Sequence, residues 1–129
     1  MNEINPLKRL WNSTADLYKR FNLDAPIKDR LTKFREEVNE FEEEIRAFEY
    51  GNGSGDALVE EAVDVIVTTI GILQKFGIDL DHLSEKIELV ALKNDAKTHE
   101  THVIWNGLIT KRSKIQKEPK TRDERGDKS

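Results

Sequence analysis

Two glutamates on one predicted helix are the first residues in this sequence whose spacing suits chemistry. Glu37 and Glu40 are three residues apart within residues 27–50, which have the apolar periodicity of a helix. At about 100° per residue, their side chains lie about 60° apart on the helix surface and one turn apart along it. Oxygens of both carboxylates can therefore reach one ion. Glu36 points almost directly away from the apolar face, so Glu37 is the better placed of these two neighbours.

Glu61 and Asp64 repeat the three-residue spacing in a second predicted helix. Asp64 interrupts an otherwise apolar run, residues 62–67. Burying an unpaired carboxylate costs several kcal/mol, so Asp64 requires a cation, strong donors or a neighbouring Lys or Arg. A narrow strip of small or polar side chains follows this helix, and such a strip can face a water-lined site between helices. Its members are Ala57, Glu61, Asp64, Thr68 and Gly71.

Four carboxylates on two facing helices predict an oxygen-rich site of the kind that Mg²⁺ or Mn²⁺ accepts. Four further glutamates of the first of these helices are expected on a solvated face, and they are Glu42, Glu43, Glu44 and Glu49. His99 and His102 lack the spacing of a zinc-protease helix. The chain has no cysteine, which excludes a disulfide framework and a thiolate metal site.

The elements that must position these residues are predominantly helical. The pattern predicts four helices, over residues 5–21, 27–50, 56–76 and 80–98. Asp79 or Asp81 is expected to cap the fourth helix, whose inward face carries Leu80, Leu83, Ile87 and Val90 and continues with Asn94 and Lys97. Residues 103–110 predict a β-hairpin, because the Asn106-Gly107 pair readily supplies the positive φ angles of a two-residue turn. The predicted fold class is all-α, a four-helix bundle-like arrangement with a short C-terminal hairpin.

The third of these helices is open to dispute, because residues 63–70 are rich in β-branched side chains that suit a buried strand. Its length decides the matter. More than twenty residues without a turn signal, opened by Asp56 as a cap and closed by Gly77, predict a buried helix.

Charge divides the chain into two parts. Residues 111–129 contain eight Lys and Arg against four Asp and Glu, a net charge of +4, which leaves −8 for residues 1–110 of a chain with a net charge of −4. An acidic body argues against a duplex-DNA footprint and suits a cation-binding protein. We therefore predict one domain over residues 1–110 and a disordered tail over residues 111–129. Without a membrane-length or signal segment, a cytoplasmic protein without membrane contact is expected.

The acidic motifs resemble those of a known family. Glu36-Glu37-Val38-Asn39-Glu40, followed after a gap by Glu61-Ala62-Val63-Asp64, resembles the EExxE plus ExxD signature of the MazG-like nucleoside-triphosphate pyrophosphohydrolases. Residues 17–26 and 71–81 are similar to the family's segments before and after these motifs, and residues 94–97 are similar to its Asn-x-x-Lys. The resemblance covers roughly residues 15–111. The chain differs from the family's common pattern at Tyr18, Val67 and Leu108, where a His, a Tyr and a Lys are frequent.

The resemblance implies a metal-dependent hydrolysis between the α- and β-phosphates of a nucleotide. Glu37, Glu40, Glu61 and Asp64 are expected to bind Mg²⁺, with Mn²⁺ as a substitute. Glu36 or Glu37 is then expected to be the general base for an attacking water. The substrate-binding residues that follow are Asn94, Lys97, Lys93, Lys111, Tyr18 and Trp11, with Trp105 a further aromatic that could stack on a base.

The expected activity is therefore that of a Mg²⁺-dependent nucleoside triphosphate pyrophosphohydrolase, which releases a nucleoside monophosphate and pyrophosphate for nucleotide-pool sanitation or control of dUTP. One alternative is a phosphoribosyl-ATP pyrophosphohydrolase, a related all-α enzyme with similar acidic helices. An alternative of another class is a non-catalytic helical oligomerisation module. The resemblance, together with a third helix that is too apolar for one small body, implies a homodimer or homotetramer.

Overall fold

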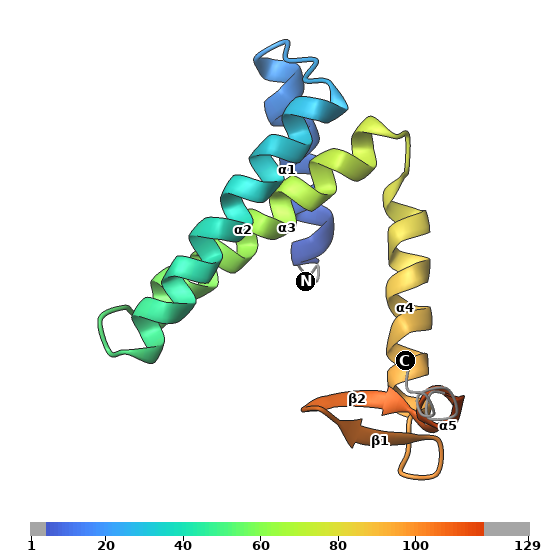
Figure 1. The fold of residues 1–129 in the computed structure, drawn as a ribbon. Coiled ribbons are helices and arrows are strands. Elements are labelled where there is room, and N and C mark those ends of the chain that lie inside the picture. Colours follow the sequence, from blue (N-terminus) through green and yellow to red (C-terminus); the bar gives the residue numbers. More distant parts are fainter. Residues whose placement is uncertain (1–4, 118–129) are drawn as a thin grey trace. The chain divides into compact units, whose positions relative to one another are not determined.

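The computed structural model describes residues 5–117 and confirms an all-α fold with a short C-terminal hairpin (Figure 1). The chain divides into two compact units between Leu83 and Ser84. The elements in chain order are α1 (Pro6–Arg20), α2 (Ile27–Glu49), α3 (Gly55–Lys75), α4 (Leu80–Ala96), β1 (His102–Trp105), β2 (Leu108–Lys111) and α5 (Arg112–Lys117). The tail predicted to be disordered, residues 111–129, therefore begins with Lys111 of β2 and with α5. Its residues 118–129 lie outside the described part of the chain.

Helix α1 begins as its sequence predicts. Asn5 is the N-cap, and its side chain accepts a hydrogen bond from the Lys8 backbone N–H at 3.1 Å. Pro6 occupies the first turn, where its missing N–H removes no helical hydrogen bond. Asn22, with a φ of 51°, lies in the left-handed region just after the helix ends.

The β-branched residues of the third predicted helix are helical in the structure, as α3. Its cap is Ser54, whose side chain accepts a hydrogen bond from the Ala57 N–H at 3.1 Å, so the prediction of Asp56 as the cap was wrong. Asp56 lies in the first turn, where its charge still favours the positive end of the helix dipole. Packing of α3 against its neighbours explains why these β-branched residues are helical, since Ile70 is only 1% exposed.

The core of the first unit lies where α3 packs against both α1 and α2. Helices α2 and α3 lie side by side along their length (Figure 1). Gln74 donates a hydrogen bond from Nε2 to the backbone carbonyl of Trp11 at 3.0 Å, which ties α3 to α1. Trp11 is 8% exposed and contributes its indole ring to this core.

The turn between α2 and α3 requires a glycine at position 53. A Cβ at Gly53 would lie 2.6 Å from Glu44 Oε2 and 3.1 Å from the Phe48 backbone nitrogen. We expect Gly53→Ala to lower the free energy of unfolding by about 1–3 kcal/mol, because the helical backbone cannot retreat from the methyl group. Thermal or urea unfolding measures this loss.

Gly55 provides a matched control in the same turn. A Cβ there would meet nothing within 4 Å, and Gly55 is the first residue of α3. Gly55→Ala should leave stability unchanged or raise it by up to about 1 kcal/mol. Equal losses for the two variants would show that the crowding at Gly53 has no energetic consequence.

The second unit contains most of α4, the hairpin and α5. Asp79 caps α4 by accepting a hydrogen bond from the His82 N–H at 2.9 Å, which decides between the two predicted caps. The helix ends at Ala96, two residues before the predicted end. None of the described residues from 84 to 115 is buried, and Ile87 and Val90 of the predicted inward face are 48% and 53% exposed. The predicted burial of this face is therefore wrong for the unit as described.

The hairpin has the predicted turn. Asn106 and Gly107 have φ angles of 54° and 79°, the pair of positive values that a type I′ turn requires. The strands are antiparallel, and the pairing runs from His102 with Lys111 to Trp105 with Leu108. Each strand extends one residue beyond the predicted range. None of the described helices is long and apolar enough to span a membrane.

Candidate metal centre

Three of the predicted metal ligands lie together between α2 and α3. One oxygen from each of Glu37, Glu61 and Asp64 lies within 4.8 Å of the other two. Glu37 comes from α2, and the other two come from α3, separated by a single helical turn. Side-by-side packing of the two helices therefore brings carboxylates that are more than twenty residues apart into one cluster.

Two oxygens of this cluster are buried without a hydrogen-bond partner among the described residues. They are Glu37 Oε1 and Glu61 Oε1. A buried carboxylate oxygen without a donor carries a large desolvation cost, which a cation offsets. The donor set contains oxygen only, and this is the chemistry that Mg²⁺ and Mn²⁺ prefer. These residues therefore fit a divalent metal ion.

The electrostatics of the cluster draw in two further glutamates. Burial raises the pKa of Glu61, and the charges of four other carboxylates raise it further; in decreasing order these are Glu40, Asp64, Glu37 and Glu44. The charge of Glu37, followed by burial, raises the pKa of Glu40. Glu40 therefore lies within the field of the cluster, although it is outside the group of three closest ligands. The mutual repulsion has the sign expected of a cation site without its cation.

Glu37 is the most buried carboxylate of the cluster, whereas Asp64, which the sequence predicted to be buried, is only partly so. Glu37 is 7% exposed, whereas Asp64 is half-buried. Helix α3 is covered on only part of its circumference, and its residues Val63 and Ile66 on either side of Asp64 are 37% and 45% exposed. Asp64 therefore borders on solvent, while Glu37 is enclosed by the facing helix.

The position of Glu44 also differs from the prediction of a solvated face. Its side chain is half-buried against the turn at Gly53, and its charge contributes to the raised pKa of Glu61. The other three glutamates predicted to be solvated, Glu42, Glu43 and Glu49, are exposed. Glu44 is seven residues beyond Glu37, which places both on one strip of α2.

Lys33 is a residue of the cluster that the sequence analysis missed. Its Nζ lies 3.0 Å from Glu37 Oε2 and 3.8 Å from Glu36 Oε1. These contacts raise the pKa of Lys33, chiefly through its hydrogen bond and charge interaction with Glu37. The side chain of Glu36 is 57% exposed, which agrees with its predicted direction away from the apolar face. The lysine-to-glutamate spacing of four residues was the signal in the sequence.

Arg30 was also missed, and it fixes α3 against α2. The residue is 7% exposed, and its guanidinium donates to the carbonyls of Gly71 and Ala25, both at 2.7 Å. It lies 4.2 Å from the ring centroid of Tyr18, within the range of a cation–π interaction. Arg30 precedes Glu37 by seven residues and so lies on the same strip of α2. Tyr18 and Trp11, predicted to bind substrate, line a cavity of about 470 Å³ together with this arginine.

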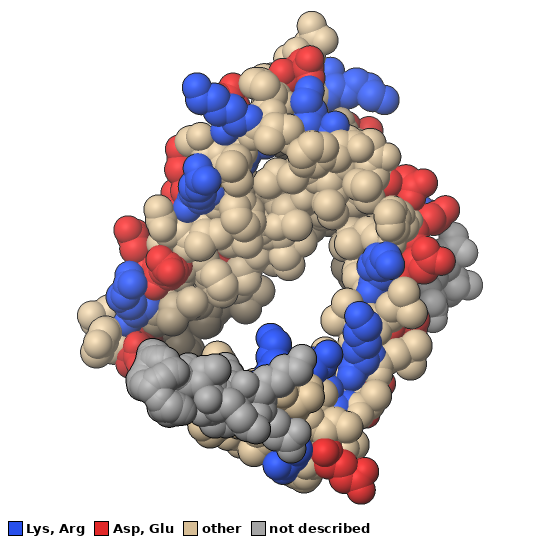
Figure 2. Space-filling view, turned by 45° about the vertical axis from the view of Figure 1, so that its right-hand side comes forward, with Lys and Arg blue, Asp and Glu red and all other residues tan. Residues whose placement is uncertain are grey.

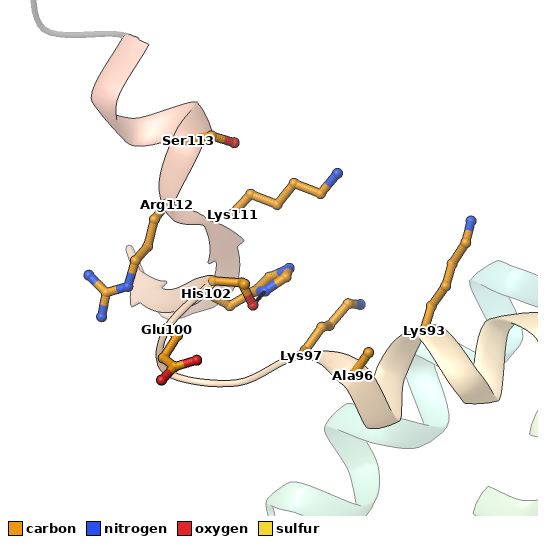
Figure 3. A pocket seen from close by; sticks show the side chains of 9 residues that line it. Lys93, Ala96, Lys97, Glu100, His102, Lys111, Arg112 and Ser113 are labelled. Atoms are coloured by element: carbon orange, nitrogen blue, oxygen red, sulfur yellow. Dashed lines mark hydrogen bonds between the residues drawn. The ribbon is translucent and has the colours of Figure 1, made fainter.

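The predicted phosphate-binding lysines gather in the second unit. Lys93, Lys97 and Lys111 line a cavity of about 660 Å³ together with His102 and Arg112. The three lysine side chains extend to one side of this pocket, whereas Arg112 and Glu100 point to the other (Figure 3). Arg112 donates from Nε to the His99 carbonyl at 2.8 Å.

Asn94 belongs to the neighbouring cavity, and it accepts a hydrogen bond from Lys97 Nζ at 3.0 Å. The predicted Asn-x-x-Lys pair is thus in contact at the C-terminal end of α4, where Asn94 lies in the last turn and Lys97 follows the final helical residue. Trp105, on β1, is 46% exposed.

The fold and the acidic centre define a class of protein, the all-α pyrophosphohydrolases that carry carboxylates on facing helices. Residues 12–90 match the phosphoribosyl-ATP pyrophosphohydrolase family. This match covers more than half of the chain, so the chain belongs to the family. The match contains all four predicted metal ligands and ends before Asn94. No curated protein and no solved structure matches the chain.

The family belongs to the MazG-like superfamily suggested by the sequence motifs, and its members hydrolyse acid anhydrides. The protein is therefore a nucleotide pyrophosphohydrolase. Of the two predicted enzyme activities, that of a phosphoribosyl-ATP pyrophosphohydrolase is closer to the family match than that of a nucleoside triphosphate pyrophosphohydrolase.

Proposed function

We propose that this protein hydrolyses the bond between the α- and β-phosphates of a nucleotide carrying a 5′-triphosphate, with Mg²⁺ as its ion and Mn²⁺ as a substitute. One observation carries the proposal. Glu37 and Glu61 each bury an oxygen that lacks a donor among the described residues, within a carboxylate cluster that Asp64 completes.

The carboxylates of the cluster would hold the metal. Glu37, Glu61 and Asp64 have the closest oxygens, and Glu40 lies within their field and is the fourth proposed ligand. When bound, a divalent ion would neutralise phosphate charge and lower the pKa of a coordinated water. Of the two predicted proton acceptors, Glu37 is the better placed, because one of its oxygens lies in the cluster, whereas Glu36 is exposed.

The lysines of the second unit are proposed to bind phosphate oxygens. Lys93, Lys97 and Lys111 share one cavity, and three positive charges suit the pyrophosphate that leaves in this reaction. In Figure 2, basic side chains along α4 lie among acidic ones. Asn94, held by Lys97, is proposed to contact the sugar or a phosphate. Base contact by Tyr18 or Trp11 stays a prediction.

The family match makes phosphoribosyl-ATP the first substrate to test, and nucleoside triphosphates including dUTP are the second candidate class. Both carry the same triphosphate chain, so both would release pyrophosphate. The full-length protein should be incubated with Mg²⁺ and each nucleotide, with pyrophosphate and the monophosphate product measured separately. A higher kcat/KM on phosphoribosyl-ATP assigns the family activity. A higher value on dUTP or another triphosphate assigns nucleotide-pool sanitation, and no pyrophosphate from any substrate would contradict the proposal.

A homodimer or homotetramer is proposed from the surface of the first unit. Val59, Val63 and Ile66 follow one face of α3 and are 62%, 37% and 45% exposed. A broad uncharged area is visible on this unit in Figure 2. A second copy would remove this apolar stripe from water. Light scattering of the purified protein at micromolar concentration measures the assembly, and a monomer would contradict it.

A further inference from the structure

Lys33 lies one helical turn before Glu37 and contacts the acidic cluster from α2. Its ammonium is 3.0 Å from Glu37 Oε2 and 3.8 Å from Glu36 Oε1. Among the side chains that the structure describes, it is the one basic group that forms an ion pair with a predicted site carboxylate, since the remaining pair joins Lys75 to Asp24. A cluster of several carboxylates thus has one close cation among the described side chains.

The two oxygens of Glu37 have different environments. Oε2 is paired with Lys33, whereas Oε1 is buried and has no hydrogen-bond partner in the part of the chain that the structure describes. The ammonium of Lys33 therefore neutralises part of the charge that a divalent ion would neutralise. Both cations would share one carboxylate, and like charges on one carboxylate repel each other.

We infer that Lys33 is the internal counter-ion of the metal-free cluster and that it competes with the divalent ion for Glu37. This inference rests on the proposed function, because it assumes that the cluster binds a metal. In the metal-free protein, Lys33 stabilises the buried charge of Glu37. When a divalent ion binds, the pair between Lys33 and Glu37 is weakened or broken, which lowers the affinity for the ion.

Lys33 could have an opposite effect, because pairing with Oε2 could orient Glu37 for metal binding. The exposures of the two side chains decide which effect is larger. The Lys33 side chain is 58% exposed, whereas the Glu37 side chain is 10% exposed and already confined by α3. An exposed lysine adds little to the orientation of a confined carboxylate, but its charge still repels the ion. Competition should therefore exceed orientation.

Titration with Mn²⁺ tests this inference directly. The full-length protein is freed of metal with EDTA, desalted and titrated with Mn²⁺, and the free ion is measured by its electron paramagnetic resonance signal. Lys33→Met should bind Mn²⁺ about two- to fivefold more tightly than wild type, as expected for the loss of one partly exposed charge pair. Lys33→Arg keeps the charge and should retain the wild-type affinity.

Lys28→Met is the matched control. Lys28 is exposed on the same helix and has no ion pair among the described residues. The variant removes the same charge from α2 without touching Glu37, so its affinity should stay close to that of wild type. An equal gain in Mn²⁺ affinity in Lys28→Met would show that the effect comes from overall charge and would overturn the inference. Unchanged or weaker Mn²⁺ binding by Lys33→Met would also overturn it.

Thermal unfolding supplies a second readout that does not depend on activity. Metal-free Lys33→Met should unfold at a lower temperature than metal-free wild type. Saturating Mn²⁺ should raise the melting temperature of the variant by more than it raises that of wild type. In a Glu37→Gln background, Lys33→Met should have no such effect. If wild type itself binds no Mn²⁺, both the proposed metal site and this inference fail. If wild type binds and Lys33→Met is not tighter, the inference fails alone.

Discussion

The Glu61→Gln variant is expected to lose most of the enzyme's activity and, without metal, to unfold at a higher temperature than wild type. Glu61 provides a buried oxygen that no described residue hydrogen-bonds, and its carboxylate is repelled by four others. An amide removes that charge while keeping the shape of the side chain. A lost metal ligand should lower kcat/KM by on the order of 10²–10³-fold.

The same repulsion among carboxylates should determine how the stability of the metal-free protein depends on pH. The pKa of Glu61 and that of Glu40 are raised in the folded protein above the ordinary 4.5, so the folded state binds these protons more tightly than the unfolded state. Their contribution to stability is fully present below about the ordinary value and is lost as the pH rises through the raised values. Metal-free wild type should therefore gain stability as the pH falls from neutral toward 4.5.

Glu61→Gln should flatten this profile. Glu60→Gln is the control, because Glu60 is exposed on the same helix and lies outside the cluster. Circular dichroism melts in EDTA across this pH range measure the effect. Retention of activity by Glu61→Gln, or a profile as steep as that of wild type, would exclude Glu61 from the metal centre.

Arg30→Met is the second variant with a large expected effect, here on stability. The guanidinium bonds two backbone carbonyls, one of them on α3, and packs on the ring of Tyr18. Methionine keeps the apolar contact with the ring and removes the donors. The loss of charge-assisted hydrogen bonds at a buried site should lower the free energy of unfolding by about 2–4 kcal/mol. Urea denaturation of the metal-free protein measures this change.

Arg35→Met controls for the loss of a positive charge on α2, since Arg35 is exposed and has no ion pair among the described residues. It should change stability by less than about 0.5 kcal/mol. Arg30→Lys should recover only part of the loss, because an ammonium cannot donate in the two directions that a guanidinium serves. Similar stabilities for Arg30→Met and Arg35→Met would mean that the buried contacts contribute nothing.

The helices were predictable because the apolar periodicity of α1 and α2 matches what the core requires. For α3, the length of the segment outweighed the β-branched composition, and packing around Ile70 explains why. The choice of cap was less predictable. Ser54 and Asp56 are both good capping residues, and the preceding glycine-rich turn determines which one has the required extended backbone.

The features of the site that depend on helical geometry alone were predictable. The wheel separated Glu37 from Glu36, and the structure places them inside and outside the cluster. The degree of burial was not predictable, because it depends on which part of α3 the neighbouring helices cover. Arg30 could not be identified from local spacing alone, since one of its acceptors, the Gly71 carbonyl, is 41 residues away.

The distribution of the two tryptophans has a practical consequence. Trp11 is enclosed in the three-helix unit, and Trp105 is 46% exposed in the hairpin of the other unit. Intrinsic fluorescence of this chain therefore has two components, a blue-shifted emission that acrylamide quenches poorly and a red-shifted emission that it quenches well. Each component reports the opening of its own unit, so unlabelled protein suffices to see whether ligands act on one unit or on both.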